Sequence, residues 1–117
     1  MTTATNPADL LDTRVTAAAA GLQGIGCAAP VCAADRAGRP EVGVKHNEGR
    51  WAALRGVQRE TARGVPLADA LPSARRRWQA DLDLHTARSS GRHWIAYCTG
   101  GVEALADLAA ELDPPQS

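Results

Sequence analysis

The sequence predicts an all-α fold, a small bundle of four principal helices with one or two extra short helices. Two observations predict it. Apolar residues recur at steps of three and four in four separate stretches, the period of a helix with one buried face. Residues that start and stop helices flank these stretches. A chain of 117 residues has the size of one domain, so we expect a single helical domain over residues 1–117.

The first predicted helix starts at Asn6, a favourable N-cap, with Pro7 at the first helical position. Its apolar positions are Leu11, Val15, Ala18 and Leu22. The glycines around its expected end are Gly21, Gly24 and Gly26. Residues 23–47 are expected to form an irregular connection, in which "APVCAADRAG" could be a short helix and "PEVGVKH" is extended or loop. Residues 1–5 and 113–117 are expected to fray.

Asn47 is expected to cap a second helix, Glu48 to Arg63, that Gly64 and Pro66 would stop. Its inner face carries Trp51, Leu54, Gln58 and Thr61. Residues 67–71 would add one turn before Pro72, and a third helix would begin at Ser73. The inner face of this third helix carries Trp78, Leu82 and His85, and residues 89–91 would break it.

The fourth helix has the most regular apolar pattern, formed by Ile95, Cys98, Val102, Leu105, Ala109 and Leu112. Gly100 and Gly101 fall inside it and together cost about 2 kcal/mol relative to alanine. Two interpretations are open. Either a helix or a ligand approaches the backbone closely there, or Thr99 caps a new helix and the glycines are a break.

Composition excludes several classes of function. Thirteen basic and thirteen acidic residues cancel, so no net charge draws the chain to nucleic acid or to a membrane. Nothing resembles a signal peptide or a membrane span, and we expect a cytoplasmic protein. The three cysteines are an odd number, which favours reduced thiols. Cys27 and Cys32 lack the spacing of a zinc site, so we expect neither metal nor cofactor, and Cys98 is expected to be a small buried residue.

Two rows of like charge follow helical spacing: Arg55, Arg59 and Arg63, and Glu103, Asp107 and Glu111. Each row lies mainly opposite the apolar face of its helix. Pairing of the two rows across a subunit boundary would give a homodimer, whereas the alternative is two solvated faces. The stretch "ARRRWQ" could likewise contact phosphates, or it could be a solvated basic patch.

Two pairs of residues are candidate acid–base groups. Asp81 and His85 lie four residues apart, so the carboxylate could favour the imidazolium and make a general acid or base; otherwise His85 is a residue at the core edge. Arg88 and His93 match the Arg-x4-His motif of HEPN-type ribonucleases, in which His is the base and Arg holds the phosphate. Arg39 and His46 also match at a wider spacing, as expected of a chance pattern in an Arg-rich chain.

The aromatic residues are three tryptophans and one tyrosine: Trp51, Trp78, Trp94 and Tyr97. The tryptophans fall on different predicted helices and could converge on an apolar pocket the size of a ligand. They could equally supply bulk to a core otherwise made of Ala, Leu and Val.

The stretches "GLQGIGCAAPVCAADR" and "RHWIAYCTGG", the length, the helical content and the Arg- and Ala-rich composition of an actinobacterial protein support one resemblance. The chain resembles the small helical proteins that form the lysinoalanine bridge in lantibiotics of the cinnamycin and duramycin class. The resemblance spans the whole chain and assigns no role to an individual residue. It implies a protein that binds a dehydrated precursor peptide and promotes addition of a lysine amine to a dehydroalanine.

On this hypothesis the bundle holds the peptide in an apolar groove lined by Trp51, Trp78, Trp94 and Tyr97, with Arg88 as a further substrate-binding residue. His85 with Asp81, His93, or a carboxylate of the peptide would accept the proton. Two alternatives remain open. One is a small dimeric regulatory or adaptor protein that binds protein or nucleic acid through charged helix faces; the other is a HEPN-like ribonuclease.

Overall fold

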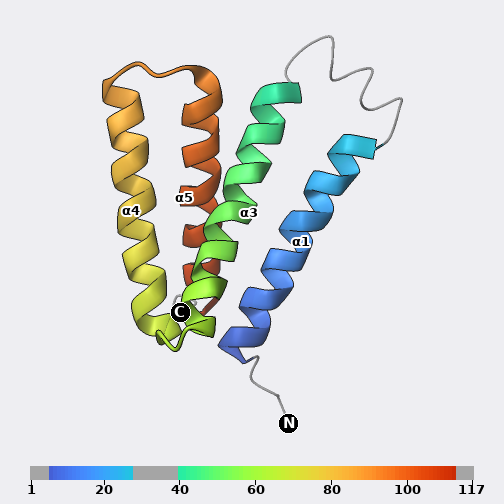
Figure 1. The fold of residues 1–117 in the computed structure, drawn as a ribbon, viewed down its shortest axis with the longest axis vertical. Coiled ribbons are helices and arrows are strands. Elements are labelled where there is room, and N and C mark those ends of the chain that lie inside the picture. The colour runs from blue at the N-terminus through green and yellow to red at the C-terminus, as the bar shows by residue number, and fades with distance from the viewer. Residues whose placement is uncertain (1–5, 28–39, 113–117) are drawn as a thin grey trace, which may run out of the picture.

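The computed structural model describes residues 6–27 and 40–112, which form an all-α bundle with no strand among them (Figure 1). The helices are α1 (Pro7–Cys27), α3 (Pro40–Ala62), α4 (Leu67–Ala87) and α5 (Arg92–Leu112). The predicted bundle of four principal helices is therefore confirmed. The predicted short helix at 28–39 and the predicted frayed ends, 1–5 and 113–117, lie outside the described residues.

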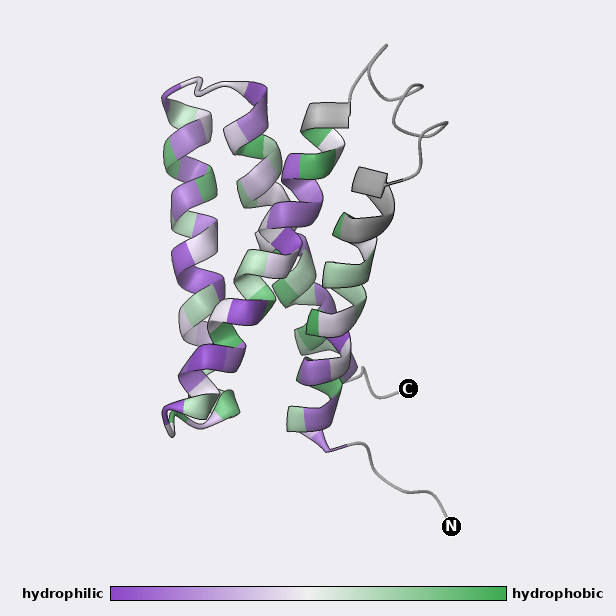
Figure 2. Ribbon diagram, turned by 45° about the vertical axis from the view of Figure 1, so that its right-hand side comes forward, coloured by the Kyte–Doolittle hydropathy of each residue, from purple (hydrophilic) through white to green (hydrophobic). Residues whose placement is uncertain are grey.

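α3 is the central helix and packs against each of the other three (Figure 1). α4 and α5 form an antiparallel hairpin, α3 crosses α5 obliquely, and α1 lies along α3. Hydrophilic and hydrophobic residues are interspersed along each helix (Figure 2), as expected for helices that bury one face and expose another. None of these four helices combines the length and the apolar character that crossing a membrane requires.

The core is built largely from leucine and alanine. Its buried residues are Leu11, Val15, Ala53, Leu54, Val57, Ala70, Leu71, Ala74, Ala104, Leu105 and Leu108. The alanines allow the helix axes to approach closely, because their side chains occupy little space. Trp51 and Trp78 are partly buried against this core, so both supply some of its bulk.

α1 begins as predicted and ends later than predicted. The side-chain oxygen Oδ1 of Asn6 accepts a hydrogen bond from the backbone N–H of Ala8 at 2.9 Å, which confirms the N-cap. The helix then continues through Gly21, Gly24 and Gly26 to Cys27, so the predicted end was wrong. Each glycine weakens a helix by about 1 kcal/mol but does not by itself stop it.

The second predicted helix starts earlier than expected. α3 begins at Pro40, which suits the first position of a helix, and Asn47 lies inside it rather than at its cap. Of the irregular connection expected over 23–47, residues 23–27 and 40–47 are therefore helical. Two alternating valines, Val42 and Val44, are too short a pattern to indicate an extended segment. The end of the helix, ahead of Gly64 and Pro66, is as predicted.

α4 is one continuous helix, and the predicted break at Pro72 was wrong. A proline inside a helix removes one N–H donor and crowds the carbonyl four residues earlier, here that of Ala68. Ala68 and Pro72 are both exposed, so water can solvate that carbonyl. The predicted break after α4 is confirmed: the N–H of Ser90 donates to the carbonyl of His85 at 2.9 Å, a common way of ending a helix.

Gly100 and Gly101 lie inside α5, so the interpretation of Thr99 as a cap was wrong. The Thr99 hydroxyl instead donates to the carbonyl of Ile95 in the same helix at 2.7 Å. A Cβ atom at Gly100 would overlap the backbone carbonyl of His46, and one at Gly49 would overlap that of Tyr97. The two backbones therefore approach closely where α3 crosses α5. This confirms the interpretation that another helix lies close to the backbone at the glycine pair.

Candidate functional site

An open pocket of about 500 Å³ lies between α4 and α5. We call it the aromatic groove, and it is lined by Arg77, Trp78, Asp81, His85, Trp94, Tyr97 and Cys98. It contains three of the predicted substrate-binding residues, Trp78, Trp94 and Tyr97, and both members of the predicted acid–base pair. The structure thus brings together residues that the sequence placed on two separate helices.

Four rings follow one another along the groove. The ring of Trp78 lies 5.3 Å from that of Tyr97, measured between centroids and tilted by 39°. Tyr97 and Trp94 meet edge to face at 6.2 Å. Trp94 and His85 are nearly parallel, with an interplanar angle of 11° and centroids 6.1 Å apart. Such pairs are worth about 0.5–1.5 kcal/mol beyond the area they bury, so they hold one another in place.

Gly101 sets the position of Trp78. A Cβ atom at this residue would overlap the indole ring, so the ring lies directly against the bare backbone of α5. The two adjacent glycines therefore make room for different neighbours: α3 packs on Gly100, and the ring of Trp78 packs on Gly101. The glycine pair was the signal in the sequence that pointed to a close approach here.

His85 contacts Ser90 rather than Asp81, the partner expected from the sequence. Its Nδ1 lies 2.9 Å from the hydroxyl oxygen of Ser90, in the turn that follows α4. His85 is near the end of the helix, where the chain folds back and brings Ser90 within reach. The contact with Ser90 and the packing against Trp94 fix the imidazole plane, and the other ring nitrogen, Nε2, has no hydrogen-bond partner within residues 6–27 and 40–112.

Tyr97 and Cys98 are both neutral near pH 7. Burial raises the pKa of the Tyr97 hydroxyl; the Glu48 carboxylate and the Cys98 thiol raise it further, while Lys45 opposes them. Burial also raises the pKa of the Cys98 thiol, and the negative charge of Asp81 adds to the effect. Cys98 is 4% exposed, so it acts as a small buried residue, as predicted, rather than as a reactive thiolate.

Lys45, the only lysine of the chain, lies beside the aromatic groove. Its Nζ is 6.0 Å from the centroid of the Trp94 ring and 3.2 Å from Oε2 of Glu48. Trp94 is 55% exposed, an unusual position for so large an apolar side chain. Sequence reasoning missed Lys45 because residues 40–47 of α3 were expected to be irregular, and with it the pairing of Lys45 with Glu48.

Three predicted site residues do not line the groove. Trp51, on α3, packs against the core instead. The predicted pocket of three tryptophans is therefore lined by two, Trp78 and Trp94. Arg88 is exposed at the end of α4, and His93 is the second residue of α5. The Arg-x4-His pair thus lies around the α4–α5 turn and outside the groove.

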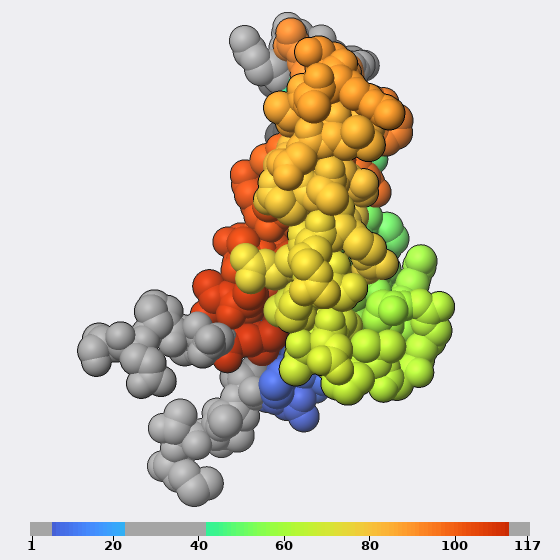
Figure 3. Space-filling model, turned by 90° about the vertical axis from the view of Figure 1, so that its left-hand side faces the viewer, coloured from blue at the N-terminus to red at the C-terminus, as the bar shows by residue number. Residues whose placement is uncertain are grey.

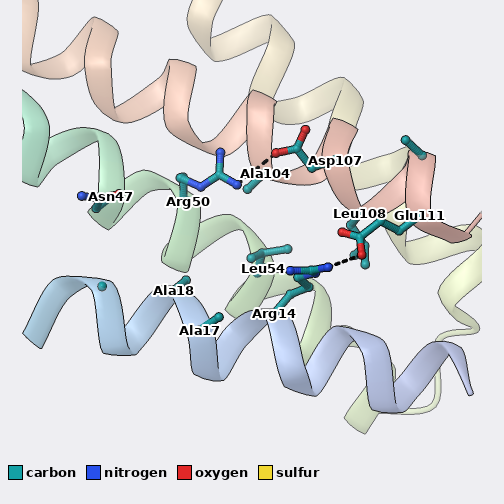
Figure 4. Close-up of a pocket in the computed structure, with 12 residues that line it drawn as sticks. Arg14, Ala17, Ala18, Asn47, Arg50, Leu54, Ala104, Asp107, Leu108 and Glu111 are labelled. Carbon is teal, nitrogen blue, oxygen red and sulfur yellow. Dashed lines mark hydrogen bonds and ion pairs between the residues drawn. The ribbon is translucent and has the colours of Figure 1, made fainter. Parts of the chain in front are cut away.

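A second pocket of about 500 Å³ lies between α1, α3 and α5 (Figure 4). Two arginines reach across it to the carboxylates of α5: Arg14 pairs with Glu111, and Arg50 pairs with Asp107 at 3.0 Å. Glu103 completes the set, with Nε2 of His46 at 3.0 Å. Because these charges compensate one another, we assign the second pocket a role in joining helices.

This pairing corrects the expectation for the acidic row. Glu103, Asp107 and Glu111 were expected to lie on a face without partners in the bundle, yet each one pairs with an arginine of α1 or α3. The reason is that α3 crosses α5 obliquely and brings its own polar residues against this face. A homodimer remains a prediction, but the acidic row no longer argues for it.

Searches against family models, characterised proteins and solved structures find no match to this chain. The function is therefore inferred from the geometry of the groove.

Proposed function

We propose that the protein binds a dehydrated peptide in the aromatic groove and promotes addition of a lysine amine to a dehydroalanine of that peptide. The observation that carries the proposal is the convergence of Trp78, Trp94 and Tyr97 with Asp81 on one open pocket of about 500 Å³. Aromatic faces with a carboxylate beside them are a suitable environment for an alkylammonium group. The volume suits a side chain with some of its backbone.

A lysine side chain fits this environment in two parts. Its apolar stem can lie along the rings, and its ammonium group can approach the carboxylate of Asp81. The protein already contains one such contact, because the ammonium group of Lys45 lies over Trp94. The groove would offer the same kind of contact to a guest, on the ring surface that Lys45 leaves open.

The reaction requires a free amine, whereas an unperturbed lysine is almost wholly protonated at pH 7. A base must therefore remove one proton before the nitrogen attacks. The nitrogen then bonds to the β-carbon of dehydroalanine, the π electrons of the double bond move toward the α-carbon, and the α-carbon takes up a proton. The ammonium group has by then lost two protons in all, one before and one after the attack; one is returned to the α-carbon, so no oxidant or reductant is needed.

His85 and Asp81 line the groove and are the residues that we propose to move the proton. The imidazole is fixed by Ser90 and Trp94, so its free nitrogen has a defined direction. Holding amine and double bond in contact can itself supply about 7–11 kcal/mol of the barrier, so positioning would be the larger part of catalysis. His93 lies outside the groove and has no part in this proposal.

The test is a cyclisation assay with a synthetic peptide that carries one lysine and one dehydroalanine. Cyclisation leaves the mass unchanged, so the readout is the loss of a dehydroalanine that a small thiol can capture, followed by mass spectrometry. We expect the protein to accelerate this loss and Trp94→Ala to reduce the rate at least about tenfold, or about 1.4 kcal/mol. A wild-type protein that neither binds the peptide nor accelerates the loss would overturn the proposal.

Leu84→Ala is the matched control. Among the residues that the structure describes, Leu84 is the other large apolar side chain on the surface, 44% exposed against 55% for Trp94, and it does not line the groove. We expect this variant to cyclise the peptide at the wild-type rate. Asp81→Asn and His85→Gln separate the two roles. We expect the first to weaken peptide binding as well as to lower the rate, and the second mainly to lower the rate at saturating peptide.

A further inference from the structure

Another concave surface lies where the C-terminal half of α3 meets α4, on the side of the molecule shown in Figure 3. We call it the arginine groove. It has a volume of about 520 Å³ and is lined by Arg55, Gly56, Arg59, Glu60, Ala62, Arg63 and Arg77. The arginine row of α3, predicted from its spacing, thus lines a pocket together with one arginine of α4.

The positive charge of this groove is only partly compensated. Glu60 is its one carboxylate, and it pairs with Arg63. Arg55 donates to the neutral side chain of Gln58 at 2.8 Å. Within residues 6–27 and 40–112, the guanidinium groups of Arg59 and Arg77 have neither a hydrogen bond nor an ion pair. A groove in which guanidinium groups outnumber carboxylates is a favourable place for anions.

Arg77 lines both the arginine groove and the aromatic groove. The two surfaces therefore meet at one residue of α4, with Trp78 next to it in the chain. A peptide that fills the aromatic groove and continues past Arg77 enters the arginine groove. This continuity indicates that one ligand can occupy both.

We propose that the arginine groove binds an acidic segment of the same peptide whose lysine occupies the aromatic groove. This inference rests on the proposed function and adds the charge pattern of the substrate. Residues four apart on a helix rise by about 6 Å, and alternate residues of an extended peptide by about 6.7 Å. Carboxylates at alternate positions of an extended segment therefore match Arg55, Arg59 and Arg63. Since the chain has no net charge, the attraction comes from this local arrangement.

The test compares three synthetic fluorescein-labelled peptides by fluorescence anisotropy. The first has one lysine followed by aspartates at alternate positions, the second has the same residues in reversed order, and the third has asparagine in place of each aspartate. We expect one of the two aspartate peptides to bind about tenfold more tightly than the asparagine peptide, a difference that decreases as salt is raised. Equal binding of all three would overturn the proposal.

The variants locate the effect. Arg59→Gln, alone and with Arg55→Gln, should remove most of the preference for aspartate. Arg76→Gln, alone and with Arg75→Gln, makes the same change of charge on exposed arginines that line a different depression of α4. We expect these controls to keep the preference. An equal loss in both sets would show attraction by overall charge and would refute an arginine groove.

Two further measurements distinguish this proposal from the cyclisation function and from nucleic-acid binding. With glutamine in place of the peptide lysine, the preference for aspartate should persist; it would then stand even if the cyclisation assay failed. A single-stranded oligonucleotide is the competing polyanion. If it binds more tightly than the aspartate peptide and depends on Arg59, then the partner of the groove is a nucleic acid and the proposal is wrong.

Discussion

At the scale of single residues, Gly101 determines whether the aromatic groove can exist. Any side chain there would overlap the indole ring of Trp78. We expect Gly101→Ala to destabilise the protein by about 1–3 kcal/mol through overpacking and to weaken peptide binding. Gly43→Ala is the control, since its Cβ meets no atom and its helix would gain about 0.5–1 kcal/mol. Urea unfolding measures both, and a neutral Gly101→Ala would contradict the assigned packing.

Cys98 and Tyr97 give the protein a dependence on alkaline pH. Folding raises the pKa of each group, so the unfolded chain releases these protons at a lower pH than the folded protein does. Stability is then complete below the ordinary pKa values, 9.0 for the thiol and 10.0 for the hydroxyl, and it falls as the pH rises past them. Urea midpoints measured from neutral to alkaline pH should show this fall.

Variants assign that fall to its source. Cys98→Ala should remove the loss of stability that begins above the ordinary pKa of the thiol, and Tyr97→Phe the loss that begins above that of the hydroxyl. Neither replacement side chain has a proton to release. The prediction fails if both variants lose stability with the same slope as the wild type. An alkaline loss that survives in both variants would have to come from other groups and would contradict the assignment.

The composition of the candidate site was only partly accessible from the sequence. Trp78, Trp94, Tyr97, Asp81 and His85 were all candidates from the sequence, and they line one pocket in the structure. Their convergence was a hypothesis, because helical periodicity does not show how two helices face each other. The partner of His85 could not be predicted, because it depends on how the turn after α4 folds back to Ser90. Trp51 was misplaced, since periodicity shows which face is apolar and not which neighbour covers it.

At the scale of helices, the existence of each element was predictable, but only some of the helix ends were. Capping at Asn6 and the stop at Gly64 follow from local chemistry and were predicted correctly. The first residues of α3 have weak helical character by themselves. They are helical because Gly49 and His46 lie against α5, a tertiary contact that no local pattern records.

Pro72 provides a test at this scale. It lies within α4 and leaves the carbonyl of Ala68 without its helical donor, so it weakens the helix. We expect Pro72→Ala to stabilise the protein by about 1–2 kcal/mol, less than the about 3 kcal/mol of a proline in a buried helix centre, because this carbonyl is solvated. Pro7→Ala, at the first position of α1, should change stability little. Destabilisation by Pro72→Ala would show that its ring matters for packing.

At the scale of the whole molecule, the grooves and α1 lie on different parts of the bundle. The aromatic groove is formed by α4 and α5, and the arginine groove by α3 and α4. α1 lies along α3 away from α4 (Figure 1), through the buried residues Leu11 and Val15. Among the described side chains, its polar links to the bundle are a hydrogen bond from Gln58 to Asp12 at 2.7 Å and the pair of Arg14 with Glu111. The binding surfaces therefore do not require α1 to stay docked.

The separate position of α1 predicts that this helix undocks and unfolds locally more easily than the rest of the bundle. α3 and α5 pack against each other along much of their length, whereas α1 has only α3 as a major partner. Amide protons of α1 should therefore exchange faster than those of α3 and α5 under native conditions.

Glu111→Gln should raise exchange in α1 by about two- to fivefold, as expected for an exposed ion pair worth about 0.5–1 kcal/mol. Glu60→Gln, which removes the exposed pair with Arg63, should leave exchange in α1 unchanged. If all four helices exchange with the same free energy of opening, the bundle is one cooperative unit and the independence of α1 is refuted.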